Sequence, residues 1–223
     1  MDMKLLLDAV KKTVAGVILI GLLLFWPAGT MHYRNGWLFC AVLFIPVVIM
    51  GIVLFWKAPD LLRKRLQEKE EQAEQKSVVA LSGLMFVGGF VLAGLDYRFG
   101  WSGMPDWLVY TAAVLFVVGY GLFAEVMREN AYLSRTVEVQ ENQVVVDTGL
   151  YGIVRHPMYS ATVLMFLAMP VILGSYVSLI IFLVYPFLIA KRIRNEEQVL
   201  EEGLQGYAEY KEKVKYRMIP FIW

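Results

Sequence analysis

The sequence has few of the residues that build disulfides and metal sites. Its 223 residues include one cysteine, Cys40, and two histidines. A single cysteine cannot form an intramolecular disulfide, so cysteine usage says nothing about the redox compartment. So few histidines and cysteines also argue against a zinc site made from these ligands, and we expect no bound metal.

The chain also lacks an excess of charge of either sign. It carries 21 Lys and Arg residues against 20 Asp and Glu, a formal net charge of +1. Nucleic-acid binding requires basic residues in excess to neutralise phosphates, so we expect no nucleic-acid partner. The expected partners are lipids or small molecules. Nothing in these counts predicts the oligomeric state.

Apolar residues are abundant, at 58% of the chain, and they cluster in blocks. The blocks cover residues 14–26, 37–56, 78–95, 107–126, 159–173 and 177–190. Several approach the roughly 20 residues that a spanning helix needs. We therefore predict an all-α integral membrane protein with about six transmembrane segments. Only three residues separate the last two blocks, which predicts a tight helical hairpin.

Basic residues predict how these segments are oriented. All Lys and Arg residues except Arg34 and Arg98 fall in connections on the same side of the membrane. The positive-inside rule then places both termini, the 57–76 loop and the segment containing Arg155 in the cytoplasm. The rule does not distinguish a bacterial inner membrane from the endoplasmic reticulum. The first block could instead be a cleaved signal peptide, but its loss would give a less consistent topology.

Two polar stretches separate apolar blocks. Residues 57–77 are rich in helix formers, with Leu61, Leu62 and Leu66 on one side, which predicts a cytoplasmic surface helix. Residues 135–149 contain two β-branched runs around Glu141 and Asn142, which predicts a short β-hairpin or an extended strap.

A glycine pattern within the fourth block resembles a dinucleotide motif. Residues 119–124 read GYGLFA and match G-x-G-x-x-A. They lie inside a helix-length apolar run, whereas the dinucleotide motif occupies a strand-to-helix turn. We interpret these small residues as sites of close helix packing.

Polar residues gather where the hairpin begins and where it ends. The sequence GLYGIVRHPMYS spans residues 149–160, and RIRNEE spans 192–197. The hairpin is short, so both stretches must return to the same membrane face. This juxtaposes a set of polar side chains, namely Tyr151, Arg155, His156, Tyr159, Arg192, Glu196 and Glu197. Pro157 suits the first turn of a helix, whose free N–H groups favour an anionic ligand.

These motifs resemble those of a known family. GLYGIVRHPMY is followed, after about thirty mostly apolar residues, by the pattern R-x-R-x-E-E-x-x-L and then by GYAEYKEKVKYRMIPF. Their combination resembles the isoprenylcysteine carboxyl methyltransferase and phospholipid methyltransferase group of integral membrane enzymes. The resemblance covers roughly residues 135–223. We therefore expect transmembrane helices over 1–130, including the 57–77 loop, and a cofactor-binding catalytic region of strap, hairpin and C-terminal helix over 131–223.

The resemblance implies S-adenosylmethionine as the methyl donor. It implies that the adenosine is lined by Gln143, Val144, Val145 and Val146, and that the cofactor is held by Tyr151, His156, Pro157, Met158 and Tyr159. Glu196 would bind the cofactor's amino group, because an ammonium group pairs with a carboxylate. Arg192 would face the methyl acceptor, for which the resemblance implies a lipophilic small molecule or lipidated substrate among the membrane lipids.

Methyl transfer from a sulfonium is an in-line displacement, which a protein can promote by positioning and by excluding water. A carboxylate acceptor is already a nucleophile, whereas an amine acceptor would need a base, for which Glu197 is the candidate. Arg192 suits a carboxylate or a phosphate on the acceptor. The sequence does not decide between O-methylation and N-methylation.

Two other functions remain open. A membrane lipid or sterol reductase that uses NADPH would need a larger pocket and further basic residues for the 2′-phosphate. A small transporter or assembly factor is non-enzymatic, and a transporter would be expected to carry charged residues or broken helices within its spans. The first three blocks have no charge in their interiors.

Overall fold

A computed structural model describes residues 2–66, 73–133 and 139–223. Within these ranges all regular secondary structure is helical, which confirms the all-α fold class. The elements are α1 (Met3–Ala28), α2 (Arg34–Lys57), α3 (Pro59–Leu66), α4 (Ala73–Phe99), α5 (Asp106–Glu129), the 3₁₀ helix η1 (Gly149–Gly152), α6 (Pro157–Ile172), α7 (Tyr176–Phe182), α8 (Tyr185–Gly203) and α9 (Tyr207–Lys213).

The apolar helices correspond to the six predicted segments. Among the described residues, five stretches are long and apolar enough to cross a membrane: Met3–Ala28, Arg34–Lys57, Lys76–Phe99, Asp106–Glu129 and Tyr176–Gly203. A sixth and shorter apolar helix is Pro157–Ile172. Many large apolar side chains on these helices are exposed, as lipid-facing surfaces require. The chain is an integral membrane protein.

Two segment boundaries differ from the sequence prediction. Helix α1 begins at Met3, well before Val14, and a carboxylate oxygen of Asp2 caps it by accepting the Leu5 N–H at 3.1 Å. The last segment is interrupted, because α7 ends at Phe182 and α8 begins at Tyr185. Pro186 lies in the first turn of α8, where its missing N–H and fixed φ are tolerated. Helix α8 then continues to Gly203, past the predicted end at Ala190.

The two polar stretches are described only in part. Over 57–66 the predicted surface helix is α3, whose Leu61 and Leu62 are buried against the bundle. Residues 139–149 contain a turn at Glu141 and Asn142 and no strand, so this part agrees with a strap. Residues 67–72 and 134–138 of these two predictions lie outside the described residues.

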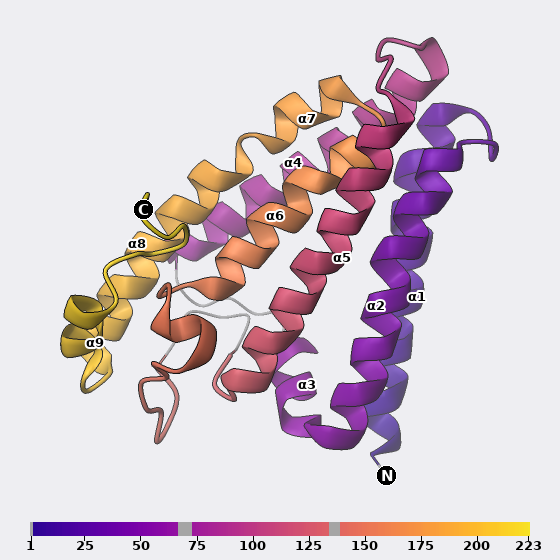
Figure 1. The fold of residues 1–223 in the computed structure, drawn as a ribbon. Helices are drawn as coiled ribbons and strands as arrows, with labels where there is room; N and C mark the ends of the chain where they lie inside the picture. The colour runs from indigo at the N-terminus through magenta and orange to yellow at the C-terminus, as the bar shows by residue number, and fades with distance from the viewer. Residues whose placement is uncertain (1, 67–72, 134–138) are drawn as a thin grey trace.

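The long helices run side by side as a bundle (Figure 1). Helices α1 and α2 form one edge, α7 and α8 form the other, and α5 packs on α6 between them. The N-terminus, α3, η1 and α9 lie at one end of the bundle. The turns from α1 to α2, α4 to α5 and α6 to α7 lie at the opposite end. This is the alternation that the positive-inside rule predicts, while the side facing the cytoplasm stays a prediction.

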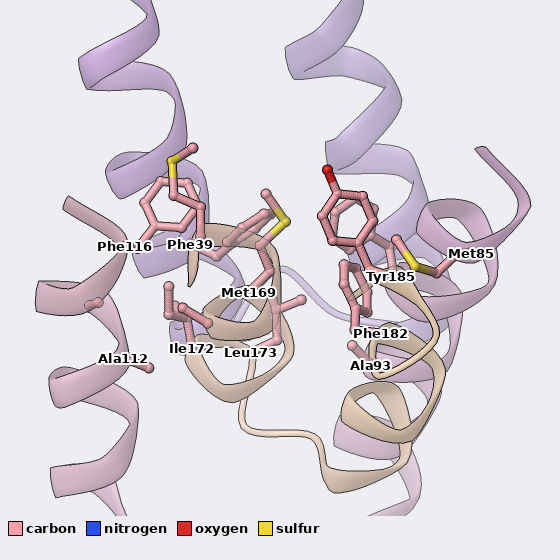
Figure 2. Packing of buried hydrophobic residues seen from close by; sticks show 14 of the residues in the cluster. Phe39, Met85, Ala93, Ala112, Phe116, Met169, Ile172, Leu173, Phe182 and Tyr185 are labelled. Carbon is pink, nitrogen blue, oxygen red and sulfur yellow. The ribbon is translucent and has the colours of Figure 1, made fainter. Parts of the chain in front are cut away.

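Aromatic and aliphatic side chains fill the centre of the bundle (Figure 2). Phe39, Phe116, Ile172 and Phe182 are almost completely buried. The ring centroids of Phe39 in α2 and Phe90 in α4 are 5.4 Å apart, and Phe39 makes an edge-to-face contact with Phe116 of α5. Ring pairs of this kind add to the energy of burial, so the core holds the helices in fixed positions around the site.

A glycine accounts for the close packing of α5 on α6. A Cβ atom on Gly119 would lie 2.7 Å from the Cγ atom of Met165, too close for an ordinary contact. Gly119 therefore lets the two helices approach, as expected for the GYGLFA stretch. This contact places the start of α6 beside the end of α5, where the candidate site is built.

Candidate functional site

A cleft opens at the end of the bundle where α6 begins. Its walls come from the 139–146 strap, η1, the start of α6, and helices α8 and α9. The lining residues are Asn130, Tyr132, Leu133, Gln143, Val144, Val145, Val146, Tyr151, Arg155, His156, Met158, Tyr159, Arg192, Glu196, Leu200, Leu204, Tyr207 and Tyr210. The free space in the cleft, including its open mouth, is about 830 Å³.

The strap enters the cleft through a strained turn. Gly149 has φ +50°, a conformation that side chains disfavour. Next to it, the Leu150 N–H donates to the Glu129 carboxylate at 3.0 Å, which ties η1 to the end of α5. This connection brings the buried Tyr151 into the wall, where the Asn130 amide donates to its hydroxyl at 2.9 Å. Burial raises the pKa of the Tyr151 hydroxyl, which therefore stays protonated.

Helix α9 forms a second wall with two tyrosines. The Tyr210 hydroxyl donates to the Tyr151 carbonyl at 2.7 Å and so joins α9 to η1. The Tyr207 hydroxyl is buried and has no hydrogen-bond partner among the described residues. Burial raises the pKa of both hydroxyls, so each is a neutral donor. An unpaired buried hydroxyl is costly, and Tyr207 is one of the residues that line the cleft.

Beneath the cleft, Glu197 is surrounded by cationic and imidazole groups. Arg155 Nε donates to Glu197 Oε1 at 2.7 Å, and Arg217 Nε donates to Glu197 Oε2 at 2.8 Å. His156 Nε2 lies 3.3 Å from Glu197 Oε1. The side chains of Arg155, His156 and Glu197 are each only 4% exposed. Because two guanidinium groups already occupy this carboxylate, we expect Glu197 to position Arg155 and His156 and not to act as a base.

Residues 214–218 complete this buried cluster by running alongside residues 155–160. The Arg155 N–H donates to the Tyr216 carbonyl at 2.9 Å, and the His156 N–H donates to the Arg217 carbonyl at 2.8 Å. A guanidinium nitrogen of Arg155 also donates to the Val214 carbonyl at 2.6 Å. The residues before α6 are therefore fixed by a segment almost sixty positions later in the sequence.

A chain of hydrogen bonds crosses the front of the cleft. Arg192 Nε donates to the Tyr159 hydroxyl at 2.8 Å, and that hydroxyl donates to Glu196 Oε2. The other carboxylate oxygen of Glu196 lies 3.8 Å from His156 Nδ1. Tyr159 thus binds one carboxylate oxygen of Glu196, and Glu196 is one of the residues that line the cleft.

An apolar groove between the helices meets the cleft. It is lined by Leu43, Val47, Arg65, Val78, Val79, Ser82, Gly83, Phe86, Phe116, Tyr120, Phe123, Met158, Tyr159, Thr162, Met165, Phe166, Met169, Tyr185, Ile189 and Arg192. Three residues line both spaces, namely Met158, Tyr159 and Arg192. The charged residues among the described lining of the groove are Arg65 and Arg192, both basic. The cleft and the apolar groove therefore share one wall.

Most of the predicted site residues surround the cleft. These are Gln143, Val144, Val145, Val146, Tyr151, His156, Met158, Tyr159, Arg192 and Glu196. Pro157 is buried as the first residue of α6, and Glu197 lies behind the wall, so neither is among the lining residues. Among the described residues no group of His, Cys, Asp and Glu is arranged to hold a metal ion.

Sequence reasoning missed other parts of the wall. They are Asn130, Tyr132, Leu133, Leu200, Leu204, Tyr207 and Tyr210. Tyr207 and Tyr210 belong to the GYAEY stretch and lie three apart, on one face of α9. That spacing could have predicted a wall formed by α9. Asn130, Tyr132 and Leu133 follow α5 and show no recognisable pattern in the sequence.

Comparison with known proteins finds matches to part of the chain that includes many of the site residues. Residues 110–202, about two fifths of the chain, match the model of the isoprenylcysteine carboxyl methyltransferase (ICMT) family. A stretch of 91 residues is 31% identical to Delta(14)-sterol reductase TM7SF2 of Mus musculus, covering 40% of this chain and 22% of that protein. The match thus spans about a fifth of the length of this curated relative. The family whose model matches residues 110–202 is thus the one that the sequence motifs resemble.

Proposed function

We propose that the protein is an S-adenosylmethionine-dependent methyltransferase that acts on a lipophilic acceptor within the membrane. The family match supports a membrane methyltransferase. The observation that carries the proposal is the shared wall of the two spaces, formed by Met158, Tyr159 and Arg192. A charged donor from water and an apolar acceptor from the bilayer would meet at these residues.

The residues of the cleft fit the cofactor. Glu196 offers a carboxylate for the amino group, and the His156 imidazole faces the same space for the cofactor carboxylate. Val144, Leu200 and Leu204 offer an apolar surface for adenosine. The unpaired hydroxyl of Tyr207 supplies a donor that no described residue uses. When bound, S-adenosylmethionine supplies a methyl group activated on a sulfonium.

The residues of the chain would promote the reaction by orienting the acceptor, by their charge and by excluding water. The hydrogen bond from Arg192 to the Tyr159 hydroxyl fixes the guanidinium group at the junction, where it would orient an anionic acceptor. An oxygen nucleophile that is already ionised needs no base, which agrees with the occupied carboxylate of Glu197. The apolar walls around the junction would exclude water.

Methyl transfer to a graded series of acceptors tests this proposal. Protein in nanodiscs would be given labelled S-adenosylmethionine and acceptors that share one head group but carry apolar tails of increasing length. We expect the apparent affinity to rise with tail length until the tail is fully buried, because each added CH₂ group contributes about 0.8 kcal/mol. A water-soluble analogue of the head group is the control. Equal activity on the soluble and lipidated forms would contradict a site that opens into the membrane.

A membrane reductase is the second candidate, because the curated relative is named as a sterol reductase. The 2′-phosphate of NADPH calls for a basic side chain that is available to bind it. Of the described cleft residues, Arg155 is already paired with Glu197, and Arg192 lies at the junction with the groove. Calorimetry with S-adenosylhomocysteine and NADPH separates the candidates. Binding of NADPH alone would overturn the methyltransferase proposal.

A further inference from the structure

The segment that closes the buried cluster ends in a compact turn with an apolar surface. In this turn, residues 218–223, Phe221 is 87% exposed, Ile222 is 77% exposed and Ile219 is 44% exposed. Figure 1 shows the chain turning back from α9 and rising beside α8, so that its end lies level with the middle of α6. The Met218 carbonyl accepts a hydrogen bond from Ser160 in the first turn of α6, so the 218–223 turn lies beside the start of that helix and not with α9.

The turn is also continuous with a lipid-facing surface. An apolar groove runs between α5 and α6, from Leu108 and Val171 to Met218 and Ile219 of the turn. The Ser160 hydroxyl of α6 donates to the Met218 carbonyl at 2.7 Å, which fixes the turn against the helix. The apolar face of the turn thus extends the surface that α5 and α6 present to lipid.

Part of the backbone of the turn is paired within the turn itself. The N–H groups of Met218 and Ile219 both donate to the Trp223 carbonyl, at 2.9 and 3.0 Å. Those of Ile222 and Trp223 donate to the Ile219 carbonyl, at 3.1 and 3.0 Å, and Pro220 carries no N–H. Irregular backbone is not tolerated in the hydrocarbon core, so a partly paired turn suits the membrane interface, where water and head groups can bind the remaining groups while the side chains reach into lipid.

We propose that the 218–223 turn lies at the membrane interface on the side of the cleft and inserts the Phe221 and Ile222 side chains into the boundary between head groups and acyl chains. Insertion would anchor residues 214–218, whose carbonyls bind Arg155 and His156. The partner of this surface is the bilayer itself. The inference concerns a lipid contact and stands independently of the proposed reaction.

Depth measurement by spin labelling tests the insertion. A nitroxide would be attached to Ile222→Cys in a Cys40→Ala background, in nanodiscs of phosphatidylcholine and phosphatidylglycerol. The matched control is Lys215→Cys, an exposed position of the same segment before the turn. We expect the label at 222 to collide with oxygen more than with a water-soluble nickel chelate, and the label at 215 to show the opposite preference.

A second label at Phe221→Cys should repeat the pattern of 222, and circular dichroism would verify that each variant is folded. Nickel accessibility at 222 equal to that at 215 would overturn the proposal. Dipolar broadening between labels on different molecules would also overturn it, because a second copy of the chain would then cover the turn.

Discussion

Arg192 and Tyr159, which stand 33 positions apart, are joined by a 2.8 Å hydrogen bond from the guanidinium Nε to the phenol oxygen. The same phenol donates to Glu196, and Tyr159 and Arg192 line both the polar cleft and the apolar groove. The Tyr159 hydroxyl thus links Arg192 and Glu196, two side chains of α8 for which we propose different roles. Glu196 faces the cleft, where the cofactor would bind, and Arg192 lies at the junction, where the acceptor would enter.

Glu196→Gln should weaken cofactor binding. The substitution keeps the shape of the side chain but removes the charge that would pair with the amino group of S-adenosylhomocysteine. A hydrogen bond to a charged group contributes about 1.5–3 kcal/mol, so the dissociation constant should rise by roughly one to two decades. Calorimetry measures this directly. The control is Glu201→Gln, whose carboxylate pairs with Lys211 outside the cleft and should leave binding unchanged.

Arg192→Ala should instead reduce turnover of the acceptor. Arg192 lies at the mouth of the groove, so its loss should lower kcat/KM for the lipid while the affinity for S-adenosylhomocysteine changes little. Arg194→Ala is the matched control, because Arg194 is an exposed arginine two positions along the same helix. Equal losses in the two variants would show that the effect is not specific to the junction.

Tyr207→Phe and Tyr210→Phe should separate binding from stability. The Tyr207 hydroxyl is buried and has no described partner, so Tyr207→Phe should leave the melting temperature unchanged or raise it, and should weaken binding of S-adenosylhomocysteine by about 0.5–1.5 kcal/mol. Tyr210→Phe removes the donor to the buried Tyr151 carbonyl and should lower the stability by about 1–3 kcal/mol. Thermal melts and calorimetry on both variants test the contrast. A melting temperature that falls equally in both would contradict a ligand-facing role for Tyr207.

Gly149→Ala should damage the site through the backbone. A Cβ atom at this position would overlap the Glu129 carboxylate, and φ of +50° is unfavourable for alanine. We expect η1 to shift, which would displace Tyr151 and weaken S-adenosylhomocysteine binding. Gly121→Ala is the control, because a Cβ there meets nothing within 4 Å and alanine is the better helix former. It should be neutral or slightly stabilising in thermal melts.

The sequence predicts the helices and one half of the cleft well, for a simple physical reason. Long apolar blocks must span the membrane, and a short hairpin must return its two ends to one face. That constraint alone brings Tyr159 near Arg192 and Glu196. The break between α7 and α8 is explained by Pro186, although we predict one continuous segment there from the sequence.

The rest of the site depends on chain returns that leave no periodic signal. Arg217 contacts Glu197 because residues 214–218 fold back beside residues 155–160 through backbone hydrogen bonds, which any side chain could make. Glu197 is buried, and its side-chain partners Arg155, His156 and Arg217 come from two distant segments that its neighbours in sequence do not reveal. For the same reason the sequence could nominate Glu197 as a base but could not reveal that its carboxylate is already occupied.

The variant Glu197→Gln distinguishes a positioning role of Glu197 from a role as a base. In the buried cluster the carboxylate balances Arg155 and Arg217, and removing one partner of a buried ion pair typically costs about 3–5 kcal/mol. If Glu197 positions the cleft, Glu197→Gln should lower the melting temperature and weaken S-adenosylhomocysteine binding together, because Arg155 and His156 lose their anchor. If Glu197 were a base, the variant should bind the cofactor normally, melt normally and fail only in turnover.

Melting curves, calorimetry and methyl-transfer rates on one preparation therefore distinguish the two, with Glu201→Gln as the exposed carboxylate control. A stable, cofactor-binding and inactive Glu197→Gln protein would require an acceptor that is deprotonated during the reaction, and would rule out the positioning role argued from the geometry.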